Sequence, residues 1–172
     1  MMQIIDVKVQ YNDLPNHYFY QLDPDDARLI FDFFIVFSRF EFALKRCGYL
    51  KGNSNQAEPD WNKFCNDFQG KYDKKVSPEF QSAWEYYTTH PPMKQVVKDD
   101  QIVWKENKQG SDSEFRWILR SIRTVRNNLF HGGKFPYDQV RDNALLFHGL
   151  MILNEVIKYD IKLERMFTHD PT

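Results

Sequence analysis

The residues with the clearest chemical potential lie in one stretch, Arg123–Gly133, which reads RTVRNNLFHGG. It sets a guanidinium (Arg126), an amide (Asn127) and an imidazole (His131) near the end of an expected helix. The negative end of the helix dipole favours the charged imidazole, and the glycines that follow leave room for a ligand. An imidazole can move the proton of a 2′-hydroxyl, and a guanidinium can stabilise charge that builds on phosphorus. The three side chains therefore predict RNA cleavage.

Arg126 also raises a problem of burial. At ~100° per residue it falls within about 40° of Ile122, the centre of the apolar face. A guanidinium buried there without a partner would cost several kcal/mol. Glu41 lies in the apolar stripe of the first long helix, four residues after Phe37 and three before Leu44. We therefore expect Arg126 and Glu41 to pair, with Glu41 orienting the guanidinium.

The other face of the same helix is basic. It carries Arg116, Arg120 and Arg123, and Lys134 follows the motif. The chain as a whole has a net charge of -1, which excludes a bulk nucleic-acid binder but not a local patch. We interpret these four residues as candidate RNA-backbone contacts. The simpler alternative for the three arginines is a solvated helix face.

Each candidate residue has a structural alternative as well. Arg126 can serve only to tie two helices together through Glu41. His131 can be a histidine that caps a helix C-terminus, and Asn127 can bond locally. These alternatives keep open a second class of function, a non-catalytic helical module that binds a nucleotide or a protein.

Capping and periodicity predict the elements that position these residues. Asp23-Pro24-Asp25-Asp26 is typical of a helix start, and Ser111 with Glu114 has the pattern of a capping box. Residues 1–22 suggest short extended segments. Residues 93–104 suggest either a β-hairpin or an extended segment that crosses the molecule. The expected helices cover residues 23–47, 61–68, 77–90, 112–130 and 138–159.

Composition narrows the class further. A chain of 172 residues predicts one domain, and the two cysteines, Cys47 and Cys65, match no zinc or redox spacing. We expect no metal and no cofactor. The first ten residues lack the pattern of a secretory signal, and the longest apolar run is too short to span a bilayer. We therefore expect a cytoplasmic protein without a membrane partner.

The sequence Arg126-Asn127-x-x-x-His131, late on one helix and followed by a second long helix, resembles the R-x4–6-H signature of HEPN domains. The resemblance covers residues 23–47 and 111–159. It implies a mainly α fold, an up-and-down helical bundle with short extended or hairpin decorations, which often dimerises. Some toxin members carry a modifiable Tyr two residues after the His. Gly133 stands at that position here, so we do not expect regulation by that route.

The resemblance also implies a function. Many HEPN domains are metal-independent ribonucleases of toxin–antitoxin, abortive-infection and CRISPR systems. We therefore expect cleavage of single-stranded RNA to a 2′,3′-cyclic phosphate. In this reaction His131 is the acid or base, Arg126 stabilises the transition state, and Asn127 orients the phosphate or Arg126. The expected partners are RNA, a second copy of the chain and a cognate antitoxin or inhibitor protein. Residues 1–172 form one domain in this interpretation, with 51–110 an insertion acting as a lid, a partner surface or core packing.

Overall fold

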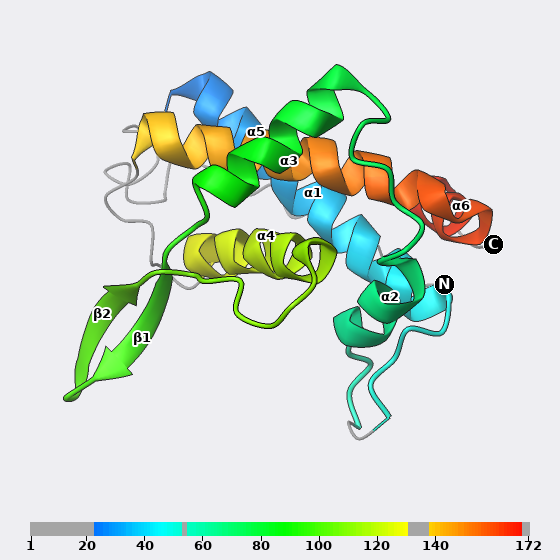
Figure 1. Ribbon diagram of the computed structural model, residues 1–172, viewed down its shortest axis with the longest axis horizontal. Coiled ribbons are helices and arrows are strands. Elements are labelled where there is room, and N and C mark those ends of the chain that lie inside the picture. The colour runs from blue at the N-terminus through cyan, green and yellow to red at the C-terminus, as the bar shows by residue number, and fades with distance from the viewer. Residues whose placement is uncertain (1–22, 53–54, 131–137, 170–172) are drawn as a thin grey trace, which may run out of the picture.

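The computed structural model describes residues 23–52, 55–130 and 138–169 of the chain (Figure 1). This part is mainly α-helical, as the sequence predicts, and none of its helices is both long and apolar enough to cross a membrane. Its elements, in chain order, are α1 (Pro24–Arg46), α2 (Trp61–Phe68), α3 (Pro78–Thr89), β1 (Lys94–Lys98), β2 (Gln101–Lys105), α4 (Glu114–Phe130), α5 (Gln139–Val156), the short 3-10 helix η2 (Ile157–Tyr159) and α6 (Ile161–Thr168). The extended pieces expected in residues 1–22 lie outside the described residues.

The first helix, α1, begins and ends where the sequence predicts. The Asp23 carboxylate accepts a hydrogen bond from the amide of Asp25 at 2.9 Å, and Pro24 occupies the first turn. This arrangement satisfies an amide that has no partner inside the helix. At the other end Gly48 has a φ of +85°, a left-handed conformation that costs glycine no Cβ clash.

The start of α4 differs from the prediction. The hydroxyl of Ser113, not that of Ser111, accepts the amide hydrogen bond at the helix start, from Arg116 at 3.3 Å. The Glu114 carboxylate accepts from the indole of Trp84 and so serves tertiary packing. The predicted capping box is therefore wrong, and the helix begins about one half-turn later.

The C-terminal part of the chain contains one helix more than the sequence analysis predicts. The long helix expected to reach Tyr159 ends as α5 at Val156 and tightens into η2. Asp160 then caps α6, because its carboxylate accepts from the amides of Lys162 and Leu163 at 2.8 and 3.0 Å.

Residues 94–105 form a hairpin, which settles the choice that the sequence left open. Lys94 pairs with Lys105 at its base, and Asp99 and Asp100 form the turn with φ of 51° and 57°. Positive φ at both central residues matches the right-handed twist of a two-residue hairpin. The hairpin projects from the helices (Figure 1).

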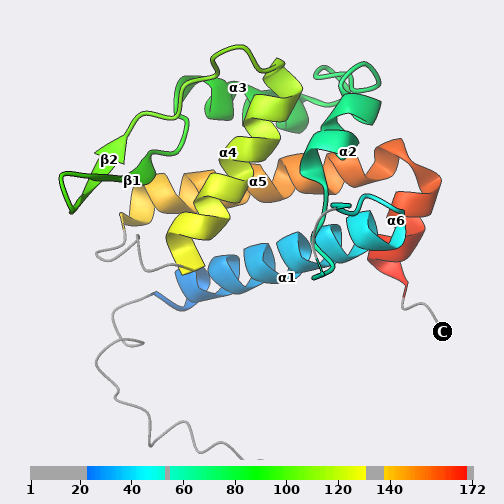
Figure 2. The same cartoon turned by 90° about the horizontal axis from the view of Figure 1, so that it is seen from below.

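One aromatic-rich core joins the helices. In Figures 1 and 2, α1 and α5 start at the same end of the molecule and run in the same direction, and Asn143 of α5 donates to Asp26 of α1 at 2.6 Å. α3 packs on α5. The largest fully buried side chains include Phe33, Phe40, Phe64, Phe68, Phe80, Trp84, Tyr87, Phe115 and Ile122. α2 and α3 supply several of them, so these two helices of the segment 51–110 contribute to core packing.

Candidate functional site

The C-terminal turn of α4 presents Arg126 between aromatic rings. Its guanidinium carbon lies 5.8 Å from the ring centre of Phe37 and 5.4 Å from that of Phe130. The guanidinium Nη1 donates to the side-chain oxygen of Asn127 at 3.2 Å. Cation–π contacts of this kind stabilise a partly desolvated charge. Arg126 is thus held at the end of the helix by aromatic contacts and by Asn127.

The expected ion pair between Arg126 and Glu41 is wrong. Glu41 accepts a hydrogen bond from the indole nitrogen of Trp61 at 3.1 Å, and none of the described ion pairs joins it to Arg126. The carboxylate of Glu41 instead acts on the next basic residue back along α4. Burial lowers the pKa of Arg123, and the Glu41 charge opposes that shift.

Helix direction gives the physical reason for this difference. α1 and α4 cross in roughly opposite senses (Figure 2). One turn forward on α1, from Phe37 to Glu41, therefore corresponds to one turn back on α4, from Arg126 to Arg123. Phe37 takes the place opposite Arg126 that the sequence analysis assigned to the carboxylate.

The candidate residues are described only in part. Arg126 is half-buried, and Asn127 is exposed beside it. His131 and Lys134 lie outside the described residues, as do the glycines expected to end the helix. The convergence of the imidazole on the guanidinium therefore stays a prediction.

The sequence analysis missed a residue that organises this end of the molecule. Asn128 is buried, and its side chain donates to the carbonyl of Met93 at 2.7 Å. Arg141, at the start of α5, donates to the carbonyl of Pro91 at 3.2 Å. The segment leading into the hairpin is thus fixed to the end of α4 and the start of α5. An amide in the last turns of the helix, at an unspecified position within the motif, was the available signal.

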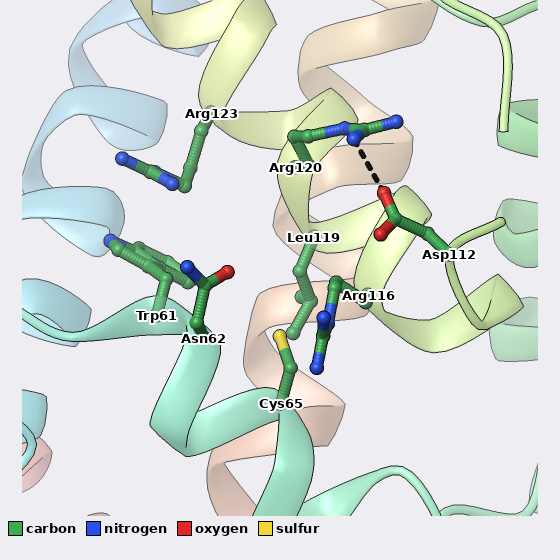
Figure 3. Close-up of a pocket in the computed structure, with 8 residues that line it drawn as sticks. All are labelled: Trp61, Asn62, Cys65, Asp112, Arg116, Leu119, Arg120 and Arg123. Atoms are coloured by element: carbon green, nitrogen blue, oxygen red, sulfur yellow. Dashed lines mark ion pairs between the residues drawn. The ribbon is translucent and has the colours of Figure 1, made fainter. Parts of the chain in front are cut away.

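A pocket of about 260 Å³ opens between α2 and α4 (Figure 3). Three arginines from successive turns of α4 line it, together with residues of α2 and the α4 entry. The lining residues are Trp61, Asn62, Cys65, Asp112, Arg116, Leu119, Arg120 and Arg123. The arginines are half-buried, because α2 lies beside that face of α4, and they stay partly open to solvent through the pocket.

Each arginine of the pocket has a different environment. Arg120 forms an ion pair with Asp112, shown dashed in Figure 3, and donates to the carbonyl of Lys108 at 3.1 Å. Arg116 donates to the side chain of Asn66. The third, Arg123, lies over the ring of Trp61, with its guanidinium carbon 5.4 Å from the ring centre.

Cys65 is the one thiol in the pocket lining, and burial raises its pKa to about 12. It therefore stays protonated near neutral pH and is a poor nucleophile. Across residues 23–52, 55–130 and 138–169, no three His, Cys, Asp or Glu side chains gather where a metal ion could bind.

Comparison with known proteins gave no match, since no family model, no curated protein and no solved structure matches the chain. The resemblance to HEPN domains therefore rests on the motif residues in the sequence and on the place of Arg126 and Asn127 at the end of α4.

Proposed function

We propose that the chain is a metal-independent endoribonuclease of the HEPN type that cuts single-stranded RNA. The observation that carries this proposal is the state of Arg126. Within the described part of the chain, no carboxylate pairs with this guanidinium, and aromatic rings hold it at the helix end. A cation with donors available for a phosphate is what transition-state stabilisation requires.

The proposed reaction is a transesterification. A base removes the proton of the 2′-hydroxyl, whose oxygen attacks the adjacent phosphorus, and the bond to the 5′-oxygen breaks as an acid protonates that oxygen. The products are a 2′,3′-cyclic phosphate and a 5′-hydroxyl. His131 supplies the acid or the base, Arg126 stabilises the charged phosphorane, and Asn127 positions the Arg126 guanidinium through its hydrogen bond.

A second copy of the chain would supply the second imidazole. One helix end offers a single His131, and two copies related by a twofold axis place an acid and a base on opposite sides of phosphorus. Apolar exposure near the site supports this arrangement. Phe31 is 61% exposed, and Phe34, which contacts Phe130 with ring centres 5.2 Å apart, is 41% exposed.

The setting we propose is microbial defence or a toxin–antitoxin pair in the cytoplasm, with an inhibitor protein that blocks the site. A ribonuclease that acts without a metal must be restrained by another means when it is not needed. Glu41 supports the site indirectly in this proposal, because it fixes Trp61, on whose ring Arg123 lies.

The test is cleavage of a single-stranded RNA in EDTA by purified protein. Arg126→Gln should lower the single-turnover rate by a factor of about 100 or more, as loss of one oxyanion donor does elsewhere. Asn127→Ala should lower it less, since Arg126 keeps its aromatic contacts. Arg165→Gln, at an exposed position of α6, is the matched control and should cut at the wild-type rate. RNA binding without cleavage by every protein would instead favour the non-catalytic module.

A further inference from the structure

The pocket between α2 and α4 lies one turn from Arg126 and has a charge pattern of its own. Its lining holds three guanidinium groups from one helix, Arg116, Arg120 and Arg123, against one carboxylate, that of Asp112. Figure 3 shows these side chains around a common space with Asn62 of α2. Cations gathered in a partly enclosed space interact more strongly with an anion than they would on an open surface.

Several hydrogen-bond donors in this pocket have no acceptor. Arg123 donates no hydrogen bond and forms no ion pair within the described part of the chain. The Nε atoms of Arg116 and Arg120 are buried there without partners. Buried donors left unpaired cost free energy, and an anion bound in the pocket would give the Arg123 guanidinium the acceptor that the described part of the chain does not supply.

The cationic groups are also held in place before any ligand binds. Arg120 is fixed by Asp112, and Arg116 by Asn66. Trp61, which supports Arg123, is fixed by Glu41 and stacks on Phe40. A preorganised site loses little conformational entropy on binding.

We propose that this pocket binds a phosphomonoester dianion, with Arg116 and Arg123 as its main donors. Guanidinium groups match the oxygens of phosphate in charge and geometry. A volume of about 260 Å³ is smaller than the sites of whole organic ligands, so it suits a phosphate and the atoms next to it. A terminal phosphate can enter such a pocket end-on. An internal phosphodiester has a nucleotide on each side, and both would have to fit.

Two sources offer this chemistry, a free mononucleotide and the 5′-phosphorylated end of an RNA. Only binding of an RNA end rests on the proposed function. Arg123 and Arg126 are three residues apart on α4, a rise of about 4.5 Å, so an RNA end held in the pocket would lie beside the candidate cleavage site.

The experiment measures binding by calorimetry with four probes: 5′-AMP, adenosine, and a single-stranded DNA with either a 5′-phosphate or a 5′-hydroxyl. DNA has no 2′-hydroxyl to attack phosphorus, so binding is measured whether or not the protein cleaves RNA. We expect 5′-AMP to bind and adenosine not to bind. If the DNA with a 5′-phosphate binds at least tenfold more tightly than the DNA with a 5′-hydroxyl, the phosphate comes from a nucleic-acid end. If 5′-AMP binds and the two DNAs bind equally, the ligand of the pocket is a free mononucleotide.

Variants test where the phosphate binds. Arg116→Gln and Arg123→Gln should each weaken 5′-AMP binding about tenfold or more, the cost of one charge-assisted hydrogen bond. Arg123→Lys, which keeps the charge, should weaken it less, and Arg165→Gln on α6 should leave it unchanged. Circular dichroism checks that each variant folds. Absence of binding by both 5′-AMP and the phosphorylated DNA, or binding that survives both glutamine variants, overturns the proposal.

Discussion

Replacing Gly149 with alanine tests a position where α5 packs tightly against buried side chains in the core. A Cβ at this position of α5 would lie 2.8 Å from the hydroxyl oxygen of Tyr87 and 3.1 Å from a ring carbon of Phe33. Both side chains are fully buried. The Tyr87 hydroxyl donates to the carbonyl of Leu145 at 2.8 Å, so the added methyl group must displace a bonded group.

The magnitude follows from three contributions to the free energy of unfolding. Overpacking a core costs about 1–3 kcal/mol. Loss of a buried hydrogen bond costs about 1–3 kcal/mol. The better helix propensity of alanine returns about 1 kcal/mol. We therefore expect Gly149→Ala to lower the stability by about 3 kcal/mol.

Urea unfolding followed by circular dichroism measures this change. Gly70→Ala is the matched control, because a Cβ there meets no atom within 4 Å, and it should change stability by no more than about 0.5 kcal/mol. In a Tyr87→Phe background the oxygen at 2.8 Å is gone, which leaves the Phe33 ring carbon at 3.1 Å and the ring carbon of residue 87 at 3.7 Å, so Gly149→Ala should cost less. An equal cost in both backgrounds, or a gain in stability, would refute the packing argument.

Three further predictions concern electrostatics and assembly. In double-mutant cycles measured by urea unfolding, the coupling free energy between Glu41→Gln and Arg123→Gln should be about 0.5–1 kcal/mol. The coupling between Glu41→Gln and Arg126→Gln should be smaller, and the reverse order would contradict the contacts described. Burial lowers the pKa of His148, so the unfolded chain binds a proton that the folded protein excludes. Stability should therefore fall as the pH drops below about 6.5, and His148→Phe should remove that part of the slope; an unchanged slope would contradict the assignment. Phe31→Glu should shift a dimer toward monomer in light scattering across a concentration series, whereas a wild-type chain that is monomeric throughout would exclude the composite site.

Local signals in the sequence predicted most of the helices. Asp23 with Pro24, and Ser77 with Pro78, mark helix starts because they act within one turn of chain, and the structure confirms both. The start of α4 was misjudged because Glu114 has a tertiary partner, Trp84, that no local pattern contains. α6 was missed because apolar residues continue through η2, which hides the break that Asp160 makes.

The candidate site was predictable in its residue types but not in its partners. The position of Arg126 in an apolar stripe predicted a buried guanidinium with a partner, and the structure leaves the residue half-buried. That its neighbours are aromatic rings depends on the crossing of α1 and α4, which a helical wheel of either helix does not contain. The arginine pocket was missed for the same reason, because the position of α2 over Arg120 and its neighbours is a property of the tertiary fold.

The most direct test of the central claim is the chemistry of the RNA ends made in EDTA by the wild type and by His131→Ala. Mass spectrometry of a short single-stranded RNA after a single turnover identifies both new ends. The proposed reaction predicts a 2′,3′-cyclic phosphate and a 5′-hydroxyl from the wild type. His131→Ala should leave the RNA intact, although the variant protein should melt at the same temperature as the wild-type protein. Cyclic ends from both proteins at equal rates, or cleavage only after a divalent metal is restored, would contradict the assignment of Arg126 and His131 as a metal-independent ribonuclease site.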